Sequence, residues 1–202
     1  MKEGKILEYL VNKSNLSKDF LDVYEKRYDD SINFIDKILN LDLVKNEQEF
    51  YVSSLVINEL FSAVRDEIRS VLMFNNGVPI SMWKDQRLNP DISEEDYQEI
   101  YQKVLSSFDM IFLTKKIIYI PEQSQIDGDS YWDIISSILF LIKQSRTLDA
   151  TLLTTAILNK ADYFVTKDQS LIKHEGKTIK EGYNLEIINT NRGNDILNKM
   201  LK

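Results

Sequence analysis

The chain has 202 residues, of which 43% are hydrophobic, so it is long enough to bury a core and too apolar to be disordered throughout. The absence of cysteine excludes disulfides and thiolate metal sites, and only six glycines and three prolines favour a helix-rich, cytoplasmic protein over a small all-β protein. The formal net charge of −7 argues against a protein that coats nucleic acid over its whole surface.

The charge is distributed unevenly along the chain. Residues 1–142 have a net charge of −10 and residues 143–202 one of +3, which together give the total of −7. A locally basic face in the C-terminal third is one interpretation, and ordinary solvated helix and loop charges are the other. No apolar segment has the length of a signal peptide or a membrane span, so we expect neither export nor membrane insertion.

Helical periodicity dominates the first half of the chain. Isoleucine and leucine recur on one face of residues 32–39, and an amphipathic pattern extends from residue 56 to residue 72. Between them, the β-prone run 50–52 ends at two serines, one of which would cap the second helix. Residues 75–90 are polar and contain glycine and proline, which predicts a loop, and a further helix is predicted from residue 93 to about residue 108.

The second half of the chain alternates short strands with helices. Residues 117–120 form a continuous apolar run that suits a strand covered on both faces. Further strands are predicted over 163–166 and 185–188, and helices over 131–143 and 147–159. The alternation predicts an α/β fold with a mainly parallel sheet flanked by helices, in a single domain of residues 1–202 with an insertion over 75–98.

Three acidic residues lie where the carboxyl ends of parallel strands would bring them together. Glu59 is predicted in the first turn after the strand at 50–55, Asp149 at the start of a helix, and Asp168 two residues past the strand at 163–166. Each has a structural explanation alone, because acids favour the first turn of a helix and Asp168 would cap a short helix. Clustered acids repel one another unless a cation lies between them, and oxygen ligands without cysteine favour Mg²⁺ or Mn²⁺.

The residues around these acids resemble the PIN domain family. In that family an Asp-Ala pair opens a helix, an Ala-Asp pair precedes a strand and a Thr-x-Asp motif ends it, as in Asp149-Ala150, Ala161-Asp162 and Thr166-Lys167-Asp168. Residues 52–60 are similar to the family's strand, serine and helix with a Glu-Leu pair, and residues 184–190 resemble its last strand. The resemblance implies a three-layer α/β/α fold with a central, mainly parallel sheet.

The resemblance also implies a fourth acid at the end of the first strand. Its best match is Asp22, 37 residues before Glu59, although Val23 and Tyr24 replace the usual Thr-Asn pair. The segment around Asp22 also fits one face of a helix, so the charge has three alternative sources, namely Asp19, Asp29 and Asp30. Residues 1–17 would be an N-terminal extension of the domain.

Similarity to PIN ribonucleases implies that one or two divalent cations, Mg²⁺ or Mn²⁺, are held by Asp22, Glu59, Asp149 and Asp168. Such cations lower the pKa of a bound water, orient it towards a phosphodiester and stabilise the departing oxygen, so no side-chain nucleophile is needed. Thr166 would hydrogen-bond a metal ligand or a bound water, or else serve packing. The candidates for contacts with RNA phosphates, or else for solvated surface charges, are Arg146, Lys167 and Lys173.

The resemblance therefore predicts a metal-dependent endoribonuclease, either the toxin of a toxin–antitoxin pair or an RNA-processing enzyme. Its expected partners are RNA, an antitoxin or other protein, and a second copy in a homodimer, without a membrane. The alternative function is a catalytically silent scaffold for RNA or protein, which the altered residues after Asp22 favour. Motifs of phosphohydrolases and nucleotide-binding proteins are absent from the sequence. Trp83 and Trp132 would stack on bases or, as we favour, pack within the fold.

Overall fold

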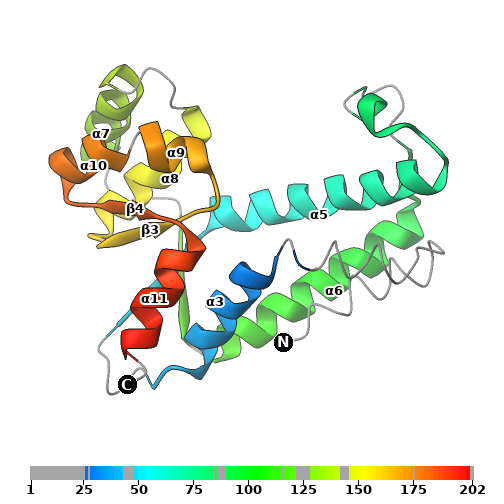
Figure 1. Ribbon diagram of the computed structural model, residues 1–202, viewed down its shortest axis with the longest axis horizontal. Coiled ribbons are helices and arrows are strands. Elements are labelled where there is room, and N and C mark those ends of the chain that lie inside the picture. Colours follow the sequence, from blue (N-terminus) through cyan, green and yellow to red (C-terminus); the bar gives the residue numbers. More distant parts are fainter. Residues whose placement is uncertain are drawn as a thin grey trace. The chain divides into compact units, whose positions relative to one another are not determined.

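The structure is a computed structural model, which describes residues 26, 28–42, 48–83, 85, 90–114, 116–121, 128–141, 146–174 and 176–200. The chain divides into two compact units (Figure 1). The first unit comprises residues 1–29 and 57–115, and the second comprises residues 30–56 and 116–202. None of the helices within the described ranges is both long enough and apolar enough to cross a membrane.

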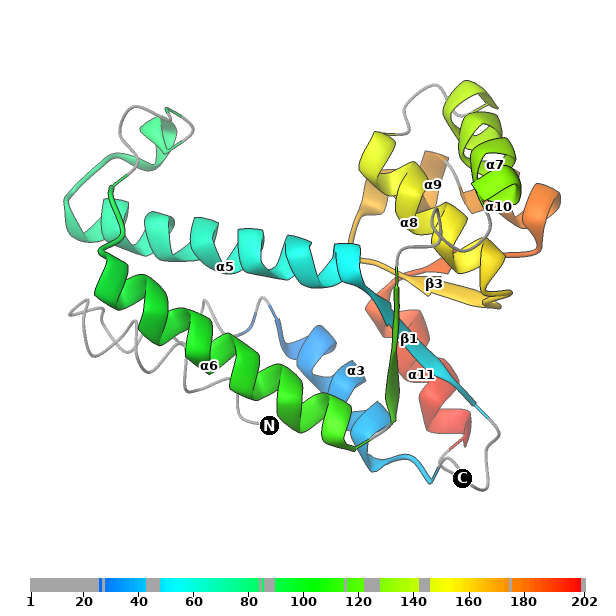
Figure 2. The same cartoon turned by 180° about the vertical axis from the view of Figure 1, so that it is seen from behind.

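The described part of the first unit is a helical hairpin. Most of α5 (Ser54–Asn75) and all of α6 (Glu94–Leu113) lie side by side and run antiparallel, with the 3₁₀ helix η1 (Ile80–Met82) in the connection between them (Figures 1 and 2). The buried apolar residues that join the two helices are Ile68, Val71, Ile100 and Val104. Both predicted helices are confirmed, and α6 continues five residues beyond its predicted end.

The capping serine of α6 shows why this helix begins where the sequence predicts. Ser93 has extended backbone angles, and its hydroxyl accepts a hydrogen bond from the backbone N–H of Asp96 (3.1 Å). Three acids follow in the first turn, where they interact favourably with the helix dipole. The local sequence therefore accounts for the start of α6 without any contact to the rest of the fold.

The second unit contains all four described strands, in two parallel pairs. β1 (Phe50–Ser53) pairs with β2 (Ile117–Ile120), and β3 (Tyr163–Val165) pairs with β4 (Glu186–Ile188). Each strand lies where the sequence predicts it, to within two residues at either end. The predicted parallel direction is also confirmed for both pairs.

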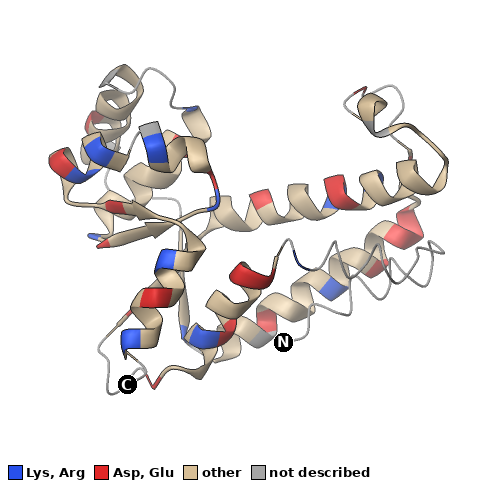
Figure 3. Ribbon diagram, viewed as in Figure 1, with Lys and Arg blue, Asp and Glu red and all other residues tan. Residues whose placement is uncertain are grey.

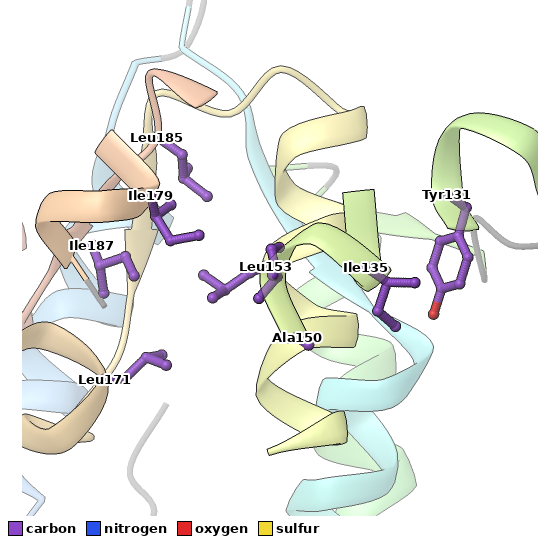
Figure 4. Packing of buried hydrophobic residues seen from close by; sticks show 9 residues of the cluster. Tyr131, Ile135, Ala150, Leu153, Leu171, Ile179, Leu185 and Ile187 are labelled. Carbon is purple, nitrogen blue, oxygen red and sulfur yellow. The ribbon is translucent and has the colours of Figure 1, made fainter. Parts of the chain in front are cut away.

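Four helices pack with β3 and β4 and form the largest described core. These helices are α7 (Gly128–Leu141), α8 (Thr147–Leu158), α9 (Gln169–His174) and α10 (Gly176–Tyr183). Leu153 on α8 is fully buried and lies between Ile135 of α7 on one side and Ile179 and Ile187 on the other (Figure 4). This core fixes the ends of α8 and β3, which carry two of the predicted site residues.

A smaller core forms where α3 (Asp29–Asn40) and α11 (Thr190–Met200) pack with β1 and β2. Its buried residues are Ile38, Leu41 and Leu197. Gly193 on α11 lies so close to α3 that an added Cβ would be 2.7 Å from Cε2 of Phe34. A side chain at this position would therefore force the ring of Phe34 to shift.

The predicted three-layer α/β/α fold with one central sheet is wrong. The described residues are mostly helical, and their strands form two separate two-stranded sheets. Strands of three or four residues offer few ladder hydrogen bonds, and a sequence pattern locates a strand without saying which strand pairs with it. The predicted burial of β2 on both faces is also wrong, because Ile118 and Tyr119 are 39% and 49% exposed.

Candidate carboxylate site

Asp168 lies between β3 and α9 and caps α9, as predicted. Its Oδ1 accepts hydrogen bonds from the backbone N–H groups of Ser170 (2.7 Å) and Leu171 (3.2 Å). Its own backbone N–H donates to Oγ1 of Thr166 (3.1 Å), so Thr166 fixes the backbone that carries the acid. The side chain is exposed, and no described residue donates a hydrogen bond to its Oδ2. The carboxylate therefore keeps one oxygen for a ligand.

Asp149 lies in the first turn of α8, which is also as predicted. Its side chain is half-buried, and it forms no hydrogen bond or ion pair with any described residue. The N-terminal end of a helix dipole stabilises an acid at this position. Because no cationic side chain in the described ranges neutralises it, this carboxylate can accept a cation.

Glu59 is exposed on α5, but it lies in the second turn of the helix and not in the first. The helix begins at Ser54, directly after β1, and the hydroxyl of Ser53 accepts a hydrogen bond from the backbone N–H of Val56 (3.4 Å). The predicted position was therefore wrong by one turn. Glu59 belongs to the first unit, whereas Asp149 and Asp168 belong to the second.

The fourth predicted acid, Asp22, lies outside the described residues, as does its alternative Asp19. The other two alternatives, Asp29 and Asp30, open α3. In the ranges that the structure describes, no three acids or histidines are grouped so that they could hold a metal ion. The donors that are described, two carboxylates at element ends, have the oxygen chemistry that Mg²⁺ and Mn²⁺ prefer.

The three predicted RNA-contacting cations lie within five residues of Asp149 or Asp168 in the chain. Arg146 directly precedes α8, Lys167 lies between β3 and α9, and Lys173 lies on α9. All three side chains are exposed. Arg146 and Lys167 thus lie at element ends that also carry Asp149 and Asp168, whereas Lys173 lies at the other end of α9.

The two tryptophans differ in environment. Trp83 is half-buried, and its Nε1 donates a hydrogen bond to the carbonyl of Val78 (2.9 Å), so it packs within its local turn as favoured. Trp132 on α7 is 62% exposed and contacts the ring of Tyr131 edge-on, with 5.1 Å between ring centroids. Trp132 therefore packs against Tyr131, but most of its surface is exposed, unlike that of a core residue.

Sequence reasoning missed a charged cluster on β4, α10 and α11. Nζ of Lys180 donates a hydrogen bond to Oε2 of Glu186 (2.9 Å), and Nη2 of Arg192 lies 3.6 Å from Oε1. The hydrogen bond from Lys180 and the two positive charges hold the pKa of Glu186 below its ordinary value. No periodicity in the sequence links the three residues, because they lie on three different elements.

Comparison of the chain with protein-family models, with curated proteins and with solved structures finds no match in any of the three. A proposal about function therefore depends on the residues described above and on the resemblance in the sequence.

Proposed function

We propose that the chain is a Mg²⁺- or Mn²⁺-dependent endoribonuclease that hydrolyses phosphodiester bonds in RNA. The observation that carries the proposal is the state of Asp149, a half-buried carboxylate that no described residue neutralises or hydrogen-bonds. Asp168 supports it, since its carboxylate is held at the end of β3 with one oxygen free of described donors. The resemblance to PIN ribonucleases implies two further ligands, Glu59 and Asp22, the second of which lies outside the described residues.

The chain's own residues have defined tasks in this proposal. A bound divalent cation supplies an activated water and stabilises charge on the leaving oxygen. Thr166 and the first amides of α9 hold Asp168 in one orientation, so that the acid does not have to be ordered when the cation arrives. Three exposed cations, Arg146, Lys167 and, at the far end of α9, Lys173, would hold RNA phosphates.

The test is cleavage of a mixed pool of single-stranded and structured RNAs with Mg²⁺ or Mn²⁺, compared with EDTA. Asp149→Asn is expected to abolish metal-dependent cleavage because it removes the charge that binds the cation. The matched control is Asp195→Asn, which removes an exposed acid from α11 in the same unit. Equal cleavage by the Asp149→Asn variant and the wild type would refute the proposal.

The resemblance also suggests partners, which we propose in addition to the nuclease activity. The toxin function implies an inhibitory protein and a homodimer, whereas an RNA-processing enzyme needs neither. Expression of the wild-type chain alone is expected to arrest growth if it is a toxin, and Asp149→Asn is expected to relieve the arrest. Normal growth with active nuclease would favour RNA processing.

A catalytically silent scaffold is the second candidate, and one observation favours it. Among the described residues, no group of three acids or histidines could hold a metal ion. Calorimetric titration with Mn²⁺ distinguishes the two candidates, since a nuclease binds the ion and loses this binding in Asp149→Asn. A folded chain that neither binds Mn²⁺ nor cleaves RNA would refute the nuclease and favour the scaffold.

A further inference from the structure

We infer that the charged cluster on β4, α10 and α11, together with an exposed tyrosine, forms a binding surface for single-stranded RNA. The choice of RNA as the ligand rests on the proposed function. This surface, the Tyr163 patch, consists of Tyr163, Lys180, Glu186 and Arg192. Tyr163 and Glu186 are paired across β3 and β4, so their side chains leave the same face of the sheet on neighbouring strands. Their neighbours Phe164 and Ile187 point into the core on the other face.

The two cations of the patch share one carboxylate. Lys180 and Arg192 approach opposite oxygens of Glu186, and their side chains remain 57% and 63% exposed. Among the four residues of the patch, one acid is shared by two cations, a balance of +1, and both cationic side chains keep N–H donors beyond those that Glu186 engages. Basic residues on α10 and α11 are visible in Figure 3. The patch also lies in the only third of the sequence with a positive balance, +3 against −10 for residues 1–142.

The aromatic ring distinguishes this patch from a simple anion site. Tyr163 is 44% exposed, at the point where its sheet neighbour Glu186 holds the two cations. Proteins that bind single strands combine backbone-tracking cations with aromatic rings on which bases stack. An acidic peptide or a free phosphate would use the cations alone, whereas RNA would use both the cations and the ring.

The patch is also within reach of the proposed cleavage site. Tyr163 begins β3 and Asp168 follows its end, so their Cα atoms are at most about 17 Å apart along an extended chain. This is the length of about five stacked nucleotides at roughly 3.4 Å each. A bound single strand of about five nucleotides is therefore long enough to span the distance from Tyr163 to Asp168.

The test measures binding of a fluorescent ten-nucleotide single-stranded RNA by polarisation, in EDTA so that no cleavage occurs. The double variant Lys180→Gln/Arg192→Gln is expected to bind roughly tenfold more weakly and to lower the salt slope by about 1.4. The control Lys177→Gln/Lys199→Gln removes the same charge from α10 and α11 outside the patch, and it is expected to change affinity less than twofold. Equal weakening by both double variants would overturn the inference.

Two further variants separate RNA from other anions and from a structural function of the ion pairs. Tyr163→Ala is expected to weaken binding at least fivefold, and Tyr163→Phe to restore it, because stacking needs the ring and not the hydroxyl. Glu186→Gln is expected to tighten binding, since it releases both cations from their carboxylate. Unchanged affinity in Tyr163→Ala, weaker binding in a folded Glu186→Gln variant, or no RNA binding by the wild type would each overturn the inference.

The outcome is distinguishable from that of the proposed function. A chain that binds RNA through the Tyr163 patch but never cleaves it refutes the nuclease and leaves the patch intact. A chain that cleaves RNA but binds it equally well in all patch variants refutes the patch alone.

Discussion

Asp168 has two functions in our reading, and paired substitutions separate them. As a cap, it needs only an oxygen that accepts the N–H groups of Ser170 and Leu171. As a cation ligand, it needs a negative charge. Asp168→Asn keeps the oxygen and removes the charge, whereas Asp168→Ala removes both. The two variants should therefore lose the same activity but different amounts of stability.

The structure sets the size of each effect. The cap begins α9, a helix of six residues that covers the core with the buried Leu171. Loss of an N-cap acceptor costs about 1 kcal/mol, which lowers the Tm of a chain of this length by roughly 2–4 °C. Asp168→Asn should stay within about 0.5 kcal/mol of the wild type. Loss of a cation ligand removes several kcal/mol of transition-state stabilisation, so both variants should lose at least about 100-fold in cleavage rate.

Urea denaturation, thermal melting and metal-dependent RNA cleavage would be measured on the same preparations of wild type, Asp168→Asn and Asp168→Ala. The expected pattern is equal loss of cleavage with unequal loss of stability. Retained cleavage in Asp168→Asn would show that Asp168 acts only as a cap, and our assignment of it to the cation would be wrong. Equal stability of the Asn and Ala variants would instead refute the capping energy that we derive from the hydrogen bonds.

Three further predictions concern stability. Gly193→Ala should lower the free energy of unfolding by about 1 kcal/mol, because the clash with Phe34 exceeds the gain in helix propensity. Urea denaturation measures this change, and a stabilised variant would contradict the close contact with Phe34. Lys160 follows α8 with φ 54°, so Lys160→Gly should stabilise the fold by about 1 kcal/mol in thermal melts whereas Lys160→Ala should not. Burial raises the pKa of Glu67, which accepts a hydrogen bond from the hydroxyl of Tyr28 (2.8 Å). Its charged form is therefore disfavoured in the folded state, and Glu67→Gln should stabilise the fold at pH 7. This gain in stability should vanish as the pH falls below the ordinary pKa of a glutamate, where the wild-type side chain is neutral in both states. A difference in stability that is the same at all pH values would contradict this.

The sequence is informative wherever a signal is local. The serine before α6, the two serines at the junction of β1 and α5, and the acid before α9 all mark element ends, because a cap involves residues only two or three positions apart. The strands at 117–120 and 163–165 are found from short apolar runs bounded by other residues. The helix α11 was not predicted, since Asn191, Gly193 and Asn194 are poor helix formers and its contacts with α3 come from 160 residues earlier in the chain.

The pairing of strands and the assembly of a site depend on residues far apart in the chain. The prediction of one sheet is wrong, and the prediction that the carboxylates converge stays a prediction. Four short strands in the right places were assigned to one sheet, but the structure pairs them as β1 with β2 and β3 with β4. The same limit applies to the carboxylates. Each was located by its position at an element end, and a shared cation requires that several such ends converge, which no local pattern encodes.

Asp149 and Asp168 can stabilise the ends of their helices and also bind a cation. A carboxylate has two oxygens, and the cap of α9 uses only Oδ1 of Asp168. A helix dipole acts on Asp149 through the whole first turn and occupies neither of its oxygens. The cap orients Asp168 and the dipole stabilises the charge of Asp149, and each acid keeps an oxygen for a cation. Substitutions that keep the local structure and remove only the charge, Asp149→Asn and Asp168→Asn, are therefore the ones that decide between a stabilising acid and a catalytic one.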